Sequence, residues 1–252
     1  MKRFKIAFPQ MLCLGLFIGF WGCALTPPPE LEYFVKTDAV LPDGEVYYID
    51  PVDSTVVWNQ EGVQVKVKFY NDEMLDARFP EYSPYTLKGV VVPELGYTPP
   101  LWTAFEITVI NRTRERVELD PTQLMIRLDN GQYYYCRQGV GGWRDGEEYF
   151  NYSYLKWGSR AGNIHYHASF ERNDIWRKTE FLREKPVRKG KKYVGIVTFP
   201  PLPPETKSFT LEVNNFILGF DRFQVGYGNP VEFTDLVFEF KVDQGVVEVS
   251  EQ

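Results

Sequence analysis

The chain has 252 residues, of which 44% are hydrophobic and 25% are charged, and its 34 acidic side chains outnumber its 28 basic ones. This length and apolar content are enough to fill one hydrophobic core without disulfide bonds. The acidic balance excludes the basic surface that nucleic-acid binding requires. We therefore predict a globular protein that does not bind nucleic acid.

The first 22 residues have the features of a secretory signal peptide. Lys2, Arg3 and Lys5 form a basic start, and an apolar run follows from Met11 to Gly22. That run is shorter than the about 20 apolar residues that a membrane-spanning helix needs. We therefore predict that residues 1–22 direct secretion and are removed.

Cys23 follows directly, and the segment Gly19–Ala24 resembles a bacterial lipobox, in which the cysteine is lipidated and becomes the first residue of the mature protein. The resemblance implies a lipid-anchored protein of the bacterial cell envelope, held in the bilayer by several acyl chains on Cys23. Residues 23–30 are proline-rich and are expected to form a stiff tether. The residue after the cysteine is Ala24 rather than the Asp of an inner-membrane retention signal, which favours the outer membrane, facing the periplasm. The mature chain would carry a net charge of 25 − 34 = −9.

An alternation of apolar and polar residues with a period of two predicts strands through most of residues 31–245, which we interpret as one domain followed by a tail, 246–252. The expected strands are 31–35, 45–49, 55–58, 63–69, 101–110, 117–119, 124–128, 132–136, 193–199, 209–213 and 233–242. Prolines exclude a helix from Pro80 to Pro100 and predict an ordered loop there.

The segment from Leu101 to Cys136 is expected to organise the fold as a β-meander. A charged turn at residues 111–116 interrupts its alternation, and Asn130-Gly131 is the pair best suited to a tight hairpin, because both residues tolerate positive φ. Cys136 is the one cysteine left in the mature chain, so no intramolecular disulfide is expected.

The order of residues in this segment resembles the immunoglobulin-like (telokin-like) extracytoplasmic domains of unknown function found in bacterial lipoproteins. The residues that carry the resemblance are Phe105, Asn111, Thr113, Val117, Leu119, Pro121, Leu124, Leu128, Gly131 and Tyr133, and downstream Gly190, Lys191, Lys192, Gly195, Val197, Phe199 and Pro200. The resemblance implies an all-β fold, an immunoglobulin-like antiparallel β-sandwich with a long, partly helical insertion. It implies no catalytic residues.

The insertion is residues 139–185, where the strand pattern fails and a short helix is expected from Asn173 to Glu184. It is rich in aromatic side chains that could bind a ligand: Trp143, Tyr149, Tyr152, Tyr154, Trp157 and Tyr166. Flat rings beside carboxylates suit a glycan or protein surface. The alternative is that these rings fasten the long loop to the sandwich.

His165 and His167 are the only histidines, and on a strand they would share one face and could chelate a metal ion. A site needs at least one further ligand, and the sequence indicates none. We therefore expect no cofactor, and interpret the pair as polar surface residues with a metal site as the alternative.

The sequence favours a non-catalytic binding or structural module for an envelope protein or glycan. The motifs of serine hydrolases and zinc proteases are missing, so we do not expect an enzyme. Two alternatives remain open, a periplasmic metal-handling lipoprotein that uses His165 and His167, and a carbohydrate-active enzyme of the cell envelope with paired carboxylates. The pattern gives no oligomeric state.

Overall fold

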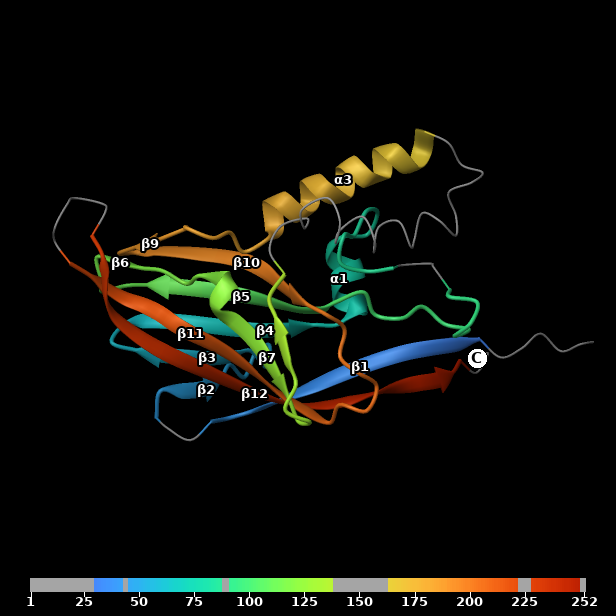
Figure 1. The fold of residues 1–252 in the computed structure, drawn as a ribbon, viewed down its shortest axis with the longest axis horizontal. Helices are drawn as coiled ribbons and strands as arrows, with labels where there is room; N and C mark the ends of the chain where they lie inside the picture. Colours follow the sequence, from blue (N-terminus) through green and yellow to red (C-terminus); the bar gives the residue numbers. More distant parts are fainter. Residues whose placement is uncertain (1–29, 43–44, 88–90, 138–162, 222–227, 250–252) are drawn as a thin grey trace, which may run out of the picture.

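The computed structural model describes residues 30–42, 45–87, 91–137, 163–221 and 228–249, with the backbone only for residues 163–169. Within these ranges the strands form two antiparallel five-stranded sheets packed face to face as a β-sandwich (Figure 1). The predicted all-β sandwich is therefore confirmed.

The first sheet has the strand order β1-β12-β11-β7-β8. Its strands are β1 (Leu31–Val40), β7 (Leu124–Leu128), β8 (Tyr133–Tyr135), β11 (Ser208–Phe220) and β12 (Pro230–Glu248). Strand β12 is longer than its apolar pattern indicated, because Glu248 pairs with Leu31 at the start of β1. The tail was predicted to begin at residue 246, but residues 246–248 belong to the sheet.

The second sheet has the order β10-β5-β4-β3-β2. Its strands are β2 (Tyr47–Ile49), β3 (Val56–Gln60), β4 (Val63–Tyr70), β5 (Thr103–Asn111) and β10 (Lys191–Phe199). Two short strands, β6 (Arg116–Val117) and β9 (Val187–Arg188), pair separately beside the sandwich. The strands expected at 55–58 and 63–69 are confirmed as β3 and β4, and they pair with each other as a hairpin.

The predicted meander from Leu101 to Cys136 is wrong, although its strands exist. Strand β5 lies in the second sheet, whereas β7 and β8 lie in the first. The turn at residues 112–115 and a short 3-10 helix (Pro121–Gln123) lie between β5 and β7, where the chain crosses from one sheet to the other. Both inner faces of a sandwich produce the same alternation, so the pattern finds strands without finding their partners.

The core between the sheets is centred on Phe105, which is fully buried. Its ring lies 5.6 to 6.0 Å, centroid to centroid, from four others: Phe69, Phe199, Phe209 and Phe240. The four rings come from both sheets, so Phe105 joins the two layers.

Two residues named in the family resemblance fix tight connections. The buried side chain of Asn111 donates to the carbonyls of Arg114 (2.9 Å) and Val187 (2.8 Å) and accepts from the Arg114 N–H, which ties the charged turn to β9. A Cβ at Gly195 would lie 2.5 Å from the Cα of Phe181, so only glycine lets that segment approach β10.

Helix α1 (Asp72–Arg78) follows β4 and was not predicted. Asn71 caps it, its side chain accepting from the Met74 N–H at 2.9 Å. Its one buried residue, Leu75, belongs to a second hydrophobic cluster on the outer face of β5 and β10, where Ala104 and Ile196 point away from the main core. Its other members are Tyr85, Leu87, Leu101, Trp102 and Trp176.

Helix α3 (Asn163–Thr179) begins ten residues before the expected helix start at Asn173 and ends before Glu184. The C-terminal end of α3 is attached to the sandwich by Trp176. This side chain is buried and stacks on Tyr85, with ring centroids 5.0 Å apart. None of the helices in the described part of the chain is long and apolar enough to span a bilayer.

Candidate functional site

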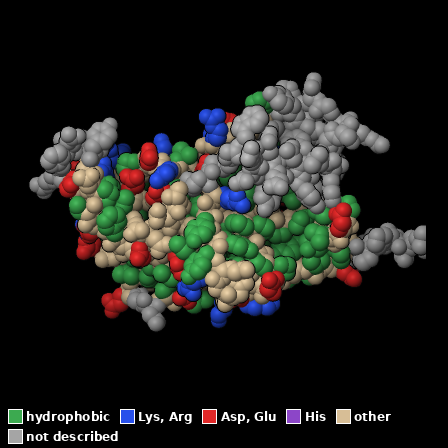
Figure 2. Space-filling model, viewed as in Figure 1, with side chains coloured by type: hydrophobic (Ala, Val, Ile, Leu, Met, Phe, Trp, Pro, Cys, Tyr) green, Lys and Arg blue, Asp and Glu red, His purple; other side chains and the backbone are tan. Residues whose placement is uncertain are grey.

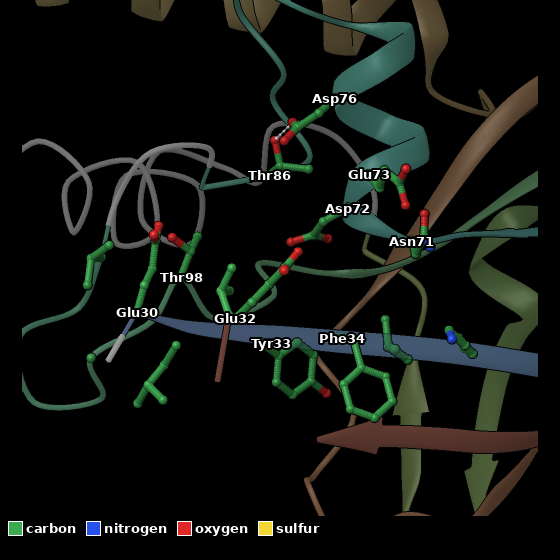
Figure 3. Close-up of a pocket in the computed structure, with 16 residues that line it drawn as sticks. Glu30, Glu32, Tyr33, Phe34, Asn71, Asp72, Glu73, Asp76, Thr86 and Thr98 are labelled. Atoms are coloured by element: carbon green, nitrogen blue, oxygen red, sulfur yellow. Dashed lines mark hydrogen bonds between the residues drawn. The ribbon is translucent and has the colours of Figure 1, made fainter. Parts of the chain in front are cut away.

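A groove of about 620 Å³ runs between strand β1 and helix α1 (Figure 3). Its walls are Glu30–Lys36, the capping residue and three residues of α1, and parts of the loop that follows. Those further lining residues are Asn71, Asp72, Glu73, Asp76, Thr86, Val91, Gly96 and Thr98, with Val249 beyond the end of β12.

Every residue from Glu30 to Lys36 lines this groove. Successive side chains of a strand point to opposite faces of the sheet, so a cavity on one face would contact only every second residue. The groove therefore follows the edge of β1, where the backbone itself is exposed.

That edge is not paired within the described residues. Strand β1 pairs only with β12, and the N–H of Val249 donates to the carbonyl of Glu30 at 2.8 Å. Residues of an antiparallel pair exchange hydrogen bonds at every second position, which assigns Glu32, Phe34 and Lys36 to the bonds with β12.

The alternate residues of β1 therefore turn their backbone groups toward the groove. Leu31, Tyr33 and Val35 each present one N–H and one C=O there. The hydrogen bonds between β12 and β11 agree with this assignment. The N–H of Val242 donates to the carbonyl of Lys207, the residue before β11, so Val242 turns its backbone groups toward β11 and not toward β1.

Carboxylates dominate the charge of the groove. Its acidic residues are Glu30, Glu32, Asp72, Glu73 and Asp76, and among the lining positions that the structure describes Lys36 is the one basic residue. Glu32 and Asp72 point their carboxylates into the same space (Figure 3). Asp76 accepts a hydrogen bond from the hydroxyl of Thr86, which fixes it against the wall.

Asp72 has the most perturbed acid–base behaviour in the groove. Its burial, reinforced by the nearby carboxylate of Asp76, raises the pKa of Asp72 from 3.8 to about 7. A carboxyl group with this pKa changes charge near neutral pH, and a cation brought next to it would favour its ionised form.

Two tyrosines lie beside the carboxylates. Tyr33 of β1 stacks on Tyr97 with ring centroids 5.9 Å apart, and its hydroxyl donates to the side-chain oxygen of Gln244 at 2.6 Å. Burial, with Tyr97 and Asp72 close by, raises the pKa of Tyr33 to about 12. Its hydroxyl therefore stays protonated, and the stacked pair connects β1 to the loop around Gly96.

Apolar side chains are exposed at the same end of the molecule. Val91 and Leu95 of the loop, and Val246, Val247 and Val249 at the end of the β12 segment, are each more than 40% exposed. Figure 2 shows hydrophobic and acidic side chains next to each other at the end where β1 begins. Such a mixed surface suits a polypeptide or glycan better than a small apolar ligand.

The aromatic ligand-binding residues predicted from the sequence are not placed by the structure. Trp143, Tyr149, Tyr152, Tyr154 and Trp157 lie outside the described residues, as does Cys23. Their role therefore stays a prediction.

His165, Tyr166 and His167 fall on the backbone of α3, which is a helix and not the strand that the metal hypothesis assumed. Positions two apart on a helix differ by about 200° around its axis, so the shared face expected for the two histidines does not exist. Among the residues whose side chains are described, no three His, Cys, Asp or Glu residues lie close enough to hold a metal ion.

No pattern in the sequence predicted the groove. Asn71-Asp72-Glu73 does carry the signature of a helix start, a capping residue followed by acidic residues. Glu30 and Glu32 lay at the boundary between the expected tether and the first strand. These segments are about 40 residues apart, and no local pattern shows that they meet.

No protein-family model matches this chain, and no curated protein matches it. Two solved structures align with it. The yjhA protein from Bacillus subtilis aligns over 63% of this chain and 76% of its own, at 13% identity and a TM-score of 0.31. The secreted protein MPT63 from Mycobacterium tuberculosis aligns over 68% and 85%, at 14% identity and a TM-score of 0.26. At these scores neither match bears on function.

Proposed function

We propose that this protein is a lipoprotein of the bacterial cell envelope, anchored through Cys23 in the outer membrane, and that it binds an envelope protein or glycan without catalysing a reaction. The observation that carries the proposal is the groove along β1, which combines an exposed strand edge, carboxylates and tyrosines on a rigid sandwich. Its immunoglobulin-like resemblance agrees with a binding scaffold.

The position of the groove supports the anchor and the binding site together. Strand β1 begins at Leu31, eight residues after Cys23 (31 − 23 = 8). At no more than about 3.6 Å per residue, the start of the groove lies within about 29 Å of the lipidated cysteine. A partner in the periplasm would therefore be bound close to the membrane.

The anchor is tested by replacing Cys23 with serine in cells fed a labelled fatty acid. The native chain is expected to take up the label and to sediment with membranes, whereas Cys23→Ser is expected to lose the label and appear in the soluble periplasmic fraction. A serine variant that still sediments with membranes would refute anchoring through this residue.

The binding surface is tested by photo-crosslinking in living cells. A photoreactive residue at Val91, which lines the groove and is 55% exposed, is compared with one at Val52, which is 91% exposed in the turn after β2. We expect a discrete adduct from position 91 and none from position 52. Equal labelling from both positions, or none from either, would contradict a binding role for the groove.

A further inference from the structure

Strand β1 offers the longest unpaired sheet edge in the described part of the chain. The edge strands β2 and β8 have three residues each, and β1 has ten. The outer edge of β10 is bridged at Ile196 by Glu180 and at Thr198 by Arg137. Proteins normally pair, cover or shorten a long edge, because its unpaired N–H and C=O groups invite another strand.

The groove has the shape and the hydrogen-bonding groups that an added strand needs. It follows seven residues, Glu30 and the first six residues of β1, about 23 Å at about 3.3 Å per residue. Leu31, Tyr33 and Val35 present backbone donors and acceptors at every second residue, the spacing that an extended polypeptide repeats. A glycan has no such repeating pattern of N–H and C=O groups, so this edge favours a polypeptide.

The charge of the groove selects the side chains of that polypeptide. A strand lying about 4.8 Å from β1 would run between Glu32 on one side and Asp72 and Asp76 on the other. Lysine and arginine side chains on it would meet carboxylates, whereas acidic ones would be repelled.

A second copy of this chain fits the groove less well. Residues 30–40 carry Glu30, Glu32, Asp38 and one Lys36, a net charge of 1 − 3 = −2. Pairing β1 with itself would bring this negative segment into an already negative groove.

Building on the proposed binding function, we propose that the partner is an extended polypeptide segment bearing lysine or arginine side chains, which adds to the free edge of β1 as a further strand. Backbone hydrogen bonds would set its position, and the carboxylates of Glu32, Asp72 and Asp76 would select its charge.

The backbone part of this proposal is tested with synthetic peptides of seven residues that alternate lysine and valine. Their binding to the detergent-solubilised full-length protein is followed by fluorescence anisotropy. Two further peptides carry N-methyl groups, one on the valines and the other on the lysines. Only one set of N–H groups faces β1, so one methylated peptide is expected to bind at least about tenfold more weakly while the other binds like the parent. Equal behaviour of the two methylated peptides, in either direction, overturns the strand-addition proposal.

The charge part is tested with a glutamate-valine peptide and with a protein variant. The acidic peptide is expected to bind at least about tenfold more weakly than the basic one. The variant Asp72→Asn with Asp76→Asn is expected to weaken the basic peptide by about tenfold, and the exposed control Glu205→Gln by less than about twofold. Equal affinity for the basic and the acidic peptide, or an unchanged affinity of the double variant for the basic peptide, overturns the proposed selection of lysine and arginine side chains.

The crosslink from position 91 separates this inference from the proposed function. An adduct from which protease digestion releases a crosslinked peptide of foreign sequence, identified by mass spectrometry, supports a polypeptide partner. An adduct with twice the mass of the chain, or one whose added mass is removed by a glycan hydrolase, overturns the basic-polypeptide inference and leaves the binding function intact. A missing adduct refutes the binding function itself.

Discussion

The raised pKa of Asp72 predicts that replacing this residue with asparagine stabilises the protein at neutral and alkaline pH. The folded protein holds this proton up to about pH 7, whereas the unfolded chain releases it near 3.8. Between these pH values the folded state binds more protons than the unfolded chain. The free energy of unfolding is therefore not reduced by Asp72 below pH 3.8, and the stability that its protonated form provides is lost as the pH rises through 7.

The magnitude follows from the two pKa values. Their difference, at 1.36 kcal/mol for each pKa unit, gives an upper bound of about 4 kcal/mol above pH 7. Asp72 is in the first turn of α1, where a negative charge gains about 0.3–1 kcal/mol from the helix dipole, and its carboxylate is partly exposed to water. We therefore expect Asp72→Asn to raise the free energy of unfolding by about 2–3 kcal/mol at pH 8 and by almost nothing at pH 4.

Urea unfolding of both proteins at several pH values measures this difference. The groups around Asp72 that also carry charge or titrate are Asp76 and Glu73 on α1 and Glu32, Tyr33 and Lys36 on β1. The control is Glu73→Gln, an exposed neighbour in the same helical turn, which should leave the pH profile unchanged. An asparagine variant that is less stable than the native protein at pH 8, or a difference that does not grow with pH, would refute the argument. Unfolding of the double variant Asp72→Asn with Asp76→Asn separates binding from folding, since weaker peptide binding by a protein that is at least as stable as the native one cannot result from unfolding.

Three further substitutions test the core and its connections by urea unfolding. Phe105→Ala should cost about 3–5 kcal/mol because it opens a cavity where the two sheets meet, whereas Phe233→Ala, at a ring that is 51% exposed, should cost less than about 1 kcal/mol. Asn111→Ala leaves buried backbone groups without partners and should cost about 2–4 kcal/mol; a cost below 1 kcal/mol would show that water replaces its side chain. Gly195→Ala forces the new Cβ against the backbone of Phe181 and should cost about 1–3 kcal/mol, and a neutral effect would mean that this segment can shift.

The strands that the sequence located best are those with one face in the core. Val63, Val65 and Val67 alternate with polar residues, and all three are fully buried in β4. The hairpin at Asn130-Gly131 was predicted for an equally local reason, because Gly131 adopts a φ of +82° that other residues rarely tolerate. Such features depend on the residue and its near neighbours alone.

Strand β1 shows where this reasoning ends. Five of its residues were predicted, and ten are observed, because Lys36 and Asp38 interrupt the apolar pattern. An edge strand keeps part of its surface in water, so polar side chains are tolerated where a central strand would exclude them. Helix α1 was missed for a related reason, since seven residues with one buried side chain are too few to show a helical period.

The candidate binding site depends entirely on tertiary structure. Its two walls, residues 30–36 and 71–76, are far apart in the sequence, and neither contains a recognisable motif. Their meeting requires β12 to reach Glu248 and pair with β1, and the second hydrophobic cluster to hold α1 on the outer face of β5 and β10. The unusual pKa of Asp72 follows from this burial and cannot be seen in the sequence.

The residue pattern alone establishes that this chain is built mainly of strands, because a period of two is a direct consequence of strands with one buried face. The sandwich was implied only by the family resemblance. The sequence also supports the predictions of a signal peptide and of an anchor at Cys23, which depend on short local segments. Tertiary structure decided which sheet each strand joins, where α1 lies and which strand edge is left open. Those outcomes depend on which apolar surfaces bury one another across the fold, and hydrophobic burial has no direction along the chain.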